Sequence, residues 1–266
     1  MNTWRYLPFL TNTSAMNMAI DEAIFNARIA DRVSNTLRFY CWQPSAVSVG
    51  RNQNLQNAVY LDTAQQLGVD VVRRISGGGA VYHAFECEVT YSVIAKISDL
   101  GISDILDVYA KISGALSDAL RLLGVSVDYN SGDAKNCPNL TVSGRKISGS
   151  SQIIRRGVVL QHGTVLVNVD LFQMFRLLKL KDVSCTHAAD VAKSKITSIQ
   201  TELGHKISPH TVVNALAQGF KAILKIQLQE ASLTVEENDV AVNLQEKYRS
   251  KEWVFDAKVV SENLYS

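Results

Sequence analysis

The stretch Arg73-Arg-Ile-Ser-Gly-Gly-Gly-Ala-Val-Tyr-His83 decides the fold of this chain. The segment before it, Val69-Asp-Val-Val, is rich in β-branched residues, and Glu88-Val-Thr-Tyr-Ser-Val-Ile-Ala95 after it alternates in polarity. Both patterns predict β-strands, so the glycines lie in a loop between two strands. A dinucleotide fingerprint needs a helix after its glycines, and the chain contains no Gly-x4-Gly-Lys-Ser/Thr motif, so two common phosphate loops are excluded.

A second glycine-rich basic segment, Ser143-Gly-Arg-Lys-Ile-Ser-Gly-Ser-Ser-Gln152, follows later in the chain. Glycines let the backbone approach a charged ligand closely, and an arginine supplies a planar fork of donors. Together the two segments predict a site for an acyl-phosphate head group, contacted by Arg73, Ser76, Gly77, Gly78 and Gly79. For the three glycines alone, the alternative is a tight turn between strands.

The rest of the chain mixes helices and strands without strict alternation. Amphipathic spacing and end signals predict helices after Asn12-Thr-Ser14, from Ile105 to just before Gly124, and from Pro209 onward. Strands are predicted on both sides of Gln43-Pro44, at 125–129, at 140–142 and in a hairpin over 152–169. The polar segment 181–205 has no clear period and is predicted to be a mobile loop.

Composition limits the classes of protein to which the chain can belong. The 266 residues are 47% hydrophobic, enough for a sizeable core, and the formal net charge of +2 gives no electrostatic footprint for nucleic acid. No apolar run long enough to span a membrane and no signal-peptide pattern occur, so we expect a cytoplasmic protein with no membrane partner. The four cysteines form no Cys-x-x-Cys pair, so we assign no metal site and no disulfide.

Lys146, which lies between Gly144 and Gly149, is the candidate catalytic residue. A carboxylate is not an electrophile, so joining a carboxylic acid to a lysine amine first requires a mixed anhydride with AMP or a thioester. Either route needs positive charge near the carbonyl or phosphate oxygen, which a flexible ammonium can supply. The alternative is a solvated lysine in a hairpin turn.

Two histidines are candidates for ligand contact. His83 closes the glycine loop, and His162 lies in Leu160-Gln-His-Gly163 on a predicted strand. Each could donate or accept a hydrogen bond at the ligand, and each could equally be a hydrogen-bonded core residue.

Seven segments, taken in order, resemble the lipoate protein ligase family, within the larger group of biotin and lipoate ligases and octanoyltransferases. They are Leu37–Trp42, Pro44–Gly50, Gln53–Asn54, Arg73–His83, Gly144–Gly149, Leu160–Gly163 and Lys251–Trp253. The resemblance implies one catalytic domain over residues 1–266 of the α/β (α+β) class, with a central mixed β-sheet flanked by helices as in class II synthetases and biotin ligases. It implies that Lys146 is catalytic and that the lipoyl-AMP or acyl chain is bound by Arg73, Ser76, Gly77, Gly78, Gly79, Tyr82, His83, Gly149 and His162.

The activity implied is that of an ATP-dependent, AMP-forming lipoate protein ligase. Such an enzyme uses ATP and Mg²⁺ to attach lipoate, through lipoyl-AMP, to the acceptor lysine of lipoyl-domain proteins. Two departures concern nucleotide and metal handling: His83-Ala84 stands where the ligases carry His-Asp, and Pro138-Asn139 where they carry Asn-Asp. Because the chain stops soon after Trp253, we expect no C-terminal accessory domain, and a separate accessory subunit would have to supply that function.

Cys137 supports an alternative, an octanoyltransferase that moves octanoyl from acyl carrier protein to a lipoyl domain through a cysteine thioester. It stands nine residues before Lys146, and Lys135 nearby would favour its thiolate, the form that attacks a thioester. Two further alternatives are biotin ligation and non-enzymatic binding of a lipoyl group.

Overall fold

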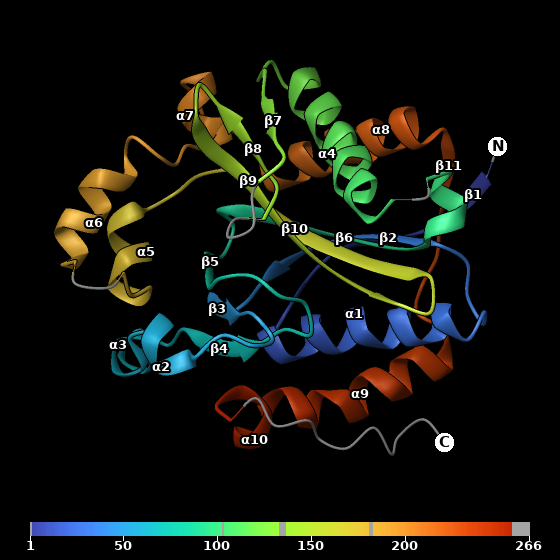
Figure 1. The fold of residues 1–266 in the computed structure, drawn as a ribbon, viewed down its shortest axis with the longest axis horizontal. Coiled ribbons are helices and arrows are strands. Elements are labelled where there is room, and N and C mark those ends of the chain that lie inside the picture. Colours follow the sequence, from blue (N-terminus) through green and yellow to red (C-terminus); the bar gives the residue numbers. More distant parts are fainter. Residues whose placement is uncertain (1, 103, 133–136, 181–182, 257–266) are drawn as a thin grey trace.

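The computed structural model describes residues 2–102, 104–132, 137–180 and 183–256. Among these residues an eight-stranded mixed sheet runs in the order β11-β1-β2-β6-β10-β9-β8-β7, and a smaller three-stranded sheet runs in the order β4-β3-β5. The expected fold class, a central mixed sheet flanked by helices, is confirmed (Figure 1).

The strands of the large sheet are β1 (Asn2–Asn12), β2 (Thr36–Trp42), β6 (Glu88–Lys96), β7 (Asp128–Asn130), β8 (Asn139–Val142), β9 (Arg145–Arg155), β10 (Val158–Leu166) and β11 (Ile226–Glu230). The small sheet contains β3 (Ala46–Val49), β4 (Asp70–Arg73) and β5 (Val81–His83). The helices are α1 (Ser14–Ile29), α2 (Leu55–Ala58), α3 (Leu61–Gln66), a 3-10 turn at Ile97–Leu100, α4 (Ile105–Leu122), α5 (Leu171–Leu177), α6 (Cys185–Ala192), α7 (Ile199–Leu203), α8 (Pro209–Leu224), α9 (Val235–Arg249) and α10 (Lys251–Val254).

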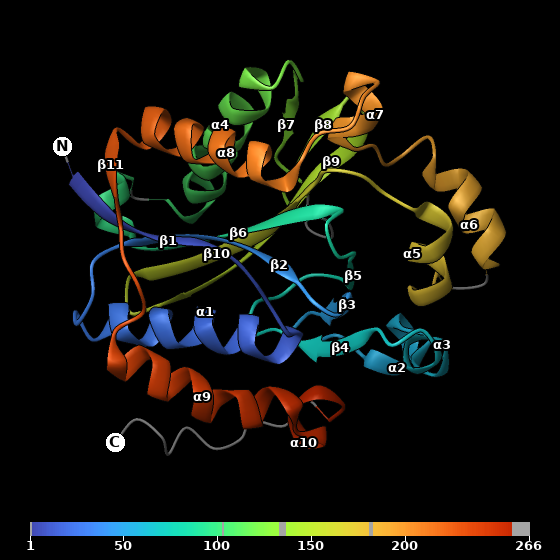
Figure 2. The same ribbon diagram turned by 180° about the vertical axis from the view of Figure 1, so that it is seen from behind.

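Two helix pairs cover the two faces of the large sheet. Helices α4 and α8 lie on one face and α1 and α9 on the other, as Figures 1 and 2 show from opposite sides. Helices α4 and α8 can approach closely because Gly219 has no Cβ, and a Cβ there would collide with the backbone of Ala115. The caps follow the sequence signals: Thr13 accepts a hydrogen bond from the amide of Met16, and Ser208 caps α8, which has Pro209 in its first turn.

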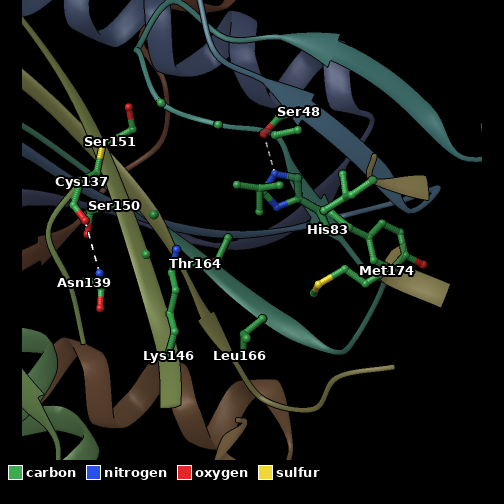
Figure 3. A pocket seen from close by; sticks show the side chains of 18 of the residues that line it. Ser48, His83, Cys137, Asn139, Lys146, Ser150, Ser151, Thr164, Leu166 and Met174 are labelled. Atoms are coloured by element: carbon green, nitrogen blue, oxygen red, sulfur yellow. Dashed lines mark hydrogen bonds between the residues drawn. The ribbon is translucent and has the colours of Figure 1, made fainter. Parts of the chain in front are cut away.

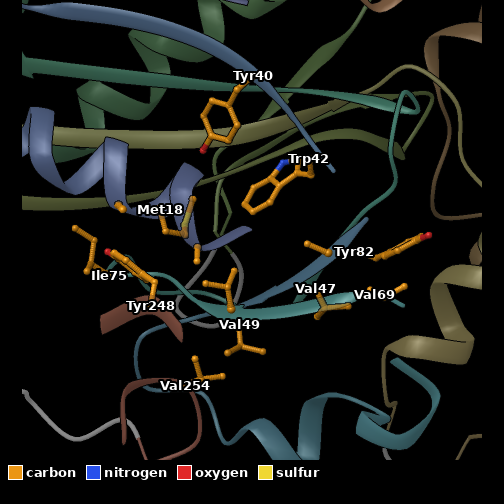
Figure 4. Packing of buried hydrophobic residues seen from close by; sticks show 14 of the residues in the cluster. Met18, Tyr40, Trp42, Val47, Val49, Val69, Ile75, Tyr82, Tyr248 and Val254 are labelled. Atoms are coloured by element: carbon orange, nitrogen blue, oxygen red, sulfur yellow. The ribbon is translucent and has the colours of Figure 1, made fainter. Parts of the chain in front are cut away.

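The small sheet carries the glycine loop, which runs between β4 and β5. Its apolar residues pack with α1 and the C-terminal helices in one buried cluster. Figure 4 shows Val49 of β3 near Tyr248 and Val254, and Val47 farther along, near Val69. The loop is therefore held from below by the hydrophobic core.

The predicted helices from residue 14, over 105–122 and from Pro209 are confirmed, as are the strands beside the cis Gln43–Pro44 bond and the 152–169 hairpin. The structure differs from the expectations at several places. The strand predicted at 125–129 is the shorter β7, Asp128–Asn130, and an unpredicted strand, β5, follows the glycines. Strand β9 begins at Arg145, so Lys146 lies on a strand, which excludes the alternative of a lysine in a hairpin turn. The segment 181–205 is not a structureless loop, because its described residues form α6 and α7, capped by Ser184 and Ser198. No helix in the described part of the chain is long and apolar enough to cross a bilayer.

Candidate active site

A cavity of about 1140 Å³ opens between the large sheet, the glycine loop and α5 (Figure 3). Its polar wall contains Arg74, Gly78, Cys137 and Lys146. An apolar wall is built from residues of β2, β5, β10 and the α5 region: Trp42, Val81, Leu166, Met174, Phe175 and Leu178. The arrangement suits a ligand with a polar, reactive end and a hydrocarbon tail.

Two features position Lys146 in the cavity: hydrogen bonds of its backbone, and the space that Gly149 leaves for its side chain. Its N–H donates to the carbonyl of Lys195 at 2.7 Å, and its own carbonyl accepts from the N–H of Thr197 at 2.9 Å. A bulge in the β8/β9 pairing accompanies this arrangement. The side chain then passes over Gly149, whose missing Cβ would lie only 2.6 Å from Cε and Nζ of the lysine. Gly149, predicted to bind ligand, therefore provides space for Lys146.

Burial lowers the pKa of the Lys146 amine below its usual value, Arg74 lowers it further, and a negative charge on Cys137 opposes the shift. The three groups thus share one electrostatic environment. A lysine with a lowered pKa can exchange a proton with substrate more readily than a fully solvated lysine.

Changing Gly149 to Ala should move the lysine without unfolding the protein. The added methyl would collide with the flexible end of Lys146 and not with backbone, so the side chain must leave its place. We expect acyl transfer to slow by roughly ten- to a hundredfold, the scale of a small misplacement at a reacting centre. Gly114→Ala in α4 is the matched control, since its Cβ would make only an ordinary contact at 3.6 Å with Ile223. Equal turnover in the two variants would contradict this role for Gly149.

Arg73, which we expected to contact the ligand head group, is not on the cavity wall. Its side chain is fully buried. The guanidinium donates to the carbonyls of Gly50, Gln53 and Val254 at 2.7 to 2.9 Å, and to that of Trp253 at 3.0 Å. Trp253 returns a hydrogen bond from Nε1 to the Arg73 carbonyl at 2.8 Å. Arg73 therefore joins the root of the glycine loop to α10, a structural role.

Arg74, which we did not single out, is the arginine that lines the cavity. Its Nη2 donates to the carbonyls of Gly77 and Gly79 at 2.6 and 2.7 Å, and its Nη1 donates to Ser48 Oγ at 3.2 Å. Burial lowers its pKa to about 10, partly offset by a negative charge on Cys137. Adjacent residues of an extended chain point to opposite faces, which separates Arg73 from Arg74.

The glycines of the loop differ in their positions and roles. Gly78 has a φ of +88° and lines the cavity with Gly79, whereas Gly77 is exposed outside the cavity wall and its carbonyl accepts a hydrogen bond from Ser151. A Cβ on Gly78 would lie 3.7 Å from the Sγ of Cys137, so the thiol lies directly beside the loop. Gly50 contacts this loop so closely that any Cβ on it would overlap the carbonyl of Gly78.

The two histidines and Tyr82 line the cavity, but Ser76 does not. Ser76 is fully buried, with its Oγ 2.6 Å from Nε2 of His162. His83 stacks on Trp42 at 4.0 Å, and its Nε2 lies 2.8 Å from Ser48 Oγ. The contact between Ser76 and His162 therefore attaches the buried side of the glycine loop to β10.

Cys137 is exposed and lines the cavity opposite His83, as Figure 3 shows. Lys135, which we expected to favour its thiolate, lies outside the described residues. Arg74 and Lys146 are the cations whose charges interact with Cys137.

ATP and Mg²⁺ can be tested against the donor set. The described lining residues include the cations Arg74, Lys146, Lys179 and Lys195, which suit an anion such as a phosphate. They include no carboxylate, the protein ligand that Mg²⁺ prefers, and no metal-binding cluster occurs among the described residues. These residues fit a phosphate but not a magnesium ion.

Comparison with known proteins places these features in a family. The lipoyl protein ligase A/B catalytic domain matches residues 13–221. Octanoyltransferase LipM of Clostridioides difficile (strain 630) is 33% identical over 269 residues, which cover 95% of this chain and 98% of that protein.

Two solved structures share the fold over almost their whole length. A lipoate-protein ligase A crystal structure with bound ATP gives a TM-score of 0.84 at 26% identity, covering 97% of this chain and 100% of that one. The bipartite lipoate protein ligase of Thermoplasma acidophilum gives a TM-score of 0.83 at 27% identity, covering 98% and 99%. The chain belongs to the lipoyl protein ligase A/B catalytic domain family.

Proposed function

We propose that this protein is an octanoyltransferase that carries the acyl group on Cys137 and passes it to the acceptor lysine of a lipoyl-domain protein. The observation that carries the proposal is the charge arrangement of the cavity. Two cations, Lys146 and the buried Arg74, line the cavity with Cys137, and no carboxylate is among the described residues of the wall. Such cations favour the thiolate, the nucleophilic form of cysteine.

The reaction divides into two balanced half-reactions. In the first, the Cys137 thiolate attacks the carbonyl of an octanoyl thioester, a new C–S bond forms, and the donor leaves as a thiol after taking a proton from the Lys146 ammonium. In the second, the acceptor amine attacks the Cys137 thioester, an amide forms, the cysteine leaves as thiolate, and Lys146 accepts the amine proton. Lys146 and Arg74 lie where they can stabilise the negative oxygen of each tetrahedral intermediate.

The similarity to octanoyltransferase LipM supports this function over lipoate ligation, which we had favoured from the sequence. Thioester transfer also needs no nucleotide, which agrees with a wall poor in ligands for Mg²⁺. The structural resemblance to lipoate ligases keeps ATP-dependent ligation as the second candidate. By the same proposal the protein is one catalytic domain whose partners are an acyl carrier protein and lipoyl-domain acceptors.

Incubation with an octanoyl thioester should add one octanoyl mass to the protein, mapped to Cys137. Cys137→Ser should lose both the adduct and at least roughly a hundredfold of the transfer rate, because a hydroxyl has little of its anionic form at neutral pH. Cys185→Ser, which changes a half-buried cysteine absent from the cavity wall, is the matched control and should behave as the unmodified chain. ATP- and lipoate-dependent modification of a lipoyl domain by Cys137→Ser, with no octanoyl adduct on the unmodified chain, would establish the ligase instead.

A further inference from the structure

The site contains two serine–histidine–carboxylate chains that the transfer reaction does not use. In the first, Ser48 Oγ lies 2.8 Å from Nε2 of His83, and Nδ1 of His83 lies 2.7 Å from Oε1 of Glu88. In the second, Ser76, His162 and Asp21 are joined in the same order at 2.6 and 3.1 Å. The two differ in access and in charge.

Neighbouring donors fix the direction of every hydrogen bond in the first chain. Trp42 Nε1 can only donate to Thr90 Oγ1, at 2.8 Å, so the Thr90 hydroxyl donates to Glu88 Oε1, at 2.7 Å. Oε1 is then an acceptor for the N–H at Nδ1 of His83. In the neutral ring Nε2 carries no proton and accepts the Ser48 hydroxyl proton.

Arg74 completes the arrangement around Ser48. Its Nη1 donates to Ser48 Oγ at 3.2 Å, which places a positive charge beside the oxygen when it loses its proton. The stacked Trp42 ring, 4.0 Å from His83 and tilted by 18°, holds the imidazole plane. An ordered imidazole base, a carboxylate behind it and a cation beside the hydroxyl are the parts of an activated serine.

Charge balance separates the two chains. Asp21 is already paired with Arg38 at 2.8 Å and accepts a hydrogen bond from Tyr40, so its charge is compensated. Glu88 is 1% exposed, its only ion-pair partner among the described residues is His83, and its Oε2 accepts no hydrogen bond from them. A proton arriving on His83 would therefore be stabilised by an otherwise uncompensated buried carboxylate.

Access separates them as well. Ser48 and His83 both line the cavity, as Figure 3 shows, and Ser48 is 2% exposed there, whereas Ser76 is fully buried and absent from the cavity wall. Of these two serines, only Ser48 therefore lies on the wall that a bound acyl group would contact.

We propose that Ser48, with His83 as general base and Glu88 behind it, is a second nucleophile of this cavity and hydrolyses acyl esters and thioesters with a medium-length hydrocarbon tail. Ser48 Oγ attacks the carbonyl and passes its proton through His83 to the departing alcohol or thiol, leaving an O-acyl serine. Water then attacks that ester, His83 removes the water proton and returns it to Ser48, and the free carboxylic acid leaves. The activity shares the cavity with the proposed transfer but needs neither Cys137 nor an acceptor lysine.

The test is covalent labelling of the full chain with an octyl fluorophosphonate, which phosphonylates activated serines with loss of fluoride. We expect one adduct on the peptide that carries Ser48 and none on Ser76. Glu88→Gln should slow labelling by roughly a hundredfold or more, because the amide cannot hold the same tautomer and charge. Ser113→Ala, which removes a buried serine of α4 that is absent from the cavity wall, should label at the original rate.

The release of octanoate from p-nitrophenyl octanoate should fall at least tenfold in Ser48→Ala. The mapping is done on the unmodified chain, so a misfolded variant would not obscure it. No adduct, or an adduct on any other residue, overturns the inference, and so does a Glu88→Gln protein that labels at the original rate. Each of these outcomes is independent of whether octanoyl is found on Cys137, so failure of this inference and failure of the proposed transfer can be told apart.

Discussion

Lys146→Ala should reduce acyl transfer by roughly a hundredfold or more, the scale on which one electrostatic contact to a transition state is lost. The side chain is the proton carrier of both proposed half-reactions, and its ammonium faces the cavity beside Cys137. The fold should persist, because the Lys146 contacts to Lys195 and Thr197 come from the backbone. Steady-state transfer and thermal melting measured together would test both statements.

The pH profile adds a second signature. Burial lowers the pKa of Lys146, so the free amine needed in the second half-reaction should form at a lower pH than for an ordinary lysine. The same shift means that keeping this lysine protonated costs folding stability, and the cost disappears as pH rises above the lowered pKa toward that of an unfolded lysine. Lys146→Arg keeps the charge but cannot give up a proton, so it should slow both half-reactions, formation of the Cys137 adduct and transfer to the acceptor. Full transfer by Lys146→Arg would refute the proton-carrying role.

Arg73→Met should destabilise the protein by about 3 kcal/mol or more, since each buried acceptor left without a donor costs about 1 to 3 kcal/mol. The Arg73 guanidinium donates to the carbonyls of Gln53, Trp253 and Val254, which lose this donor together, whereas the Gly50 carbonyl keeps a hydrogen bond from the Gln53 amide. Urea unfolding would measure the loss. The sequence alone suggested a ligand contact, for which the main effect would be weaker substrate binding.

Arg121→Met is the control for this change. Arg121 is an exposed residue of α4 paired with Asp118, and a surface pair of this kind contributes about 0 to 1 kcal/mol. If Arg73→Met kept the original unfolding midpoint but bound octanoyl thioester weakly, the clamp to α10 would be disproved and the ligand role restored.

Local patterns predicted helices α1, α4 and α8, the strands around the glycine loop and the region of the site, but not β1, β11, α5 or α9. The amphipathic stripe of α4 and the Ser208–Pro209 signal identify their helices because one face and one cap dominate each. Helices α6 and α7 were missed although Ser184 and Ser198 cap them, because both helices are short and their apolar positions few.

The site residues depended on tertiary geometry that one-dimensional patterns do not contain. The sequence cannot tell which of two adjacent arginines faces the cavity, since a single step along an extended chain reverses the direction of the side chain. It marked Gly149 as important but could not show that the missing Cβ makes room for Lys146. The Ser48–His83–Glu88 chain joins β3, β5 and β6, and no spacing in the sequence connects Ser48 to the other two residues.

The backbone bridge at Lys146 has a consequence for how this family can diversify. Between the end of β10 and Ile196 the chain makes an excursion that contains α5 and α6 and contributes Met174, Phe175 and Leu178 to the apolar wall. It returns at the bridge between Lys146 and Ile196, and a second bridge joins Leu178 to Val59. Helices α5 and α6 pack mainly on each other. Sequence changes in this excursion can therefore alter the length or shape of the hydrocarbon tail that the cavity accepts, while Lys146 on β9 stays in place.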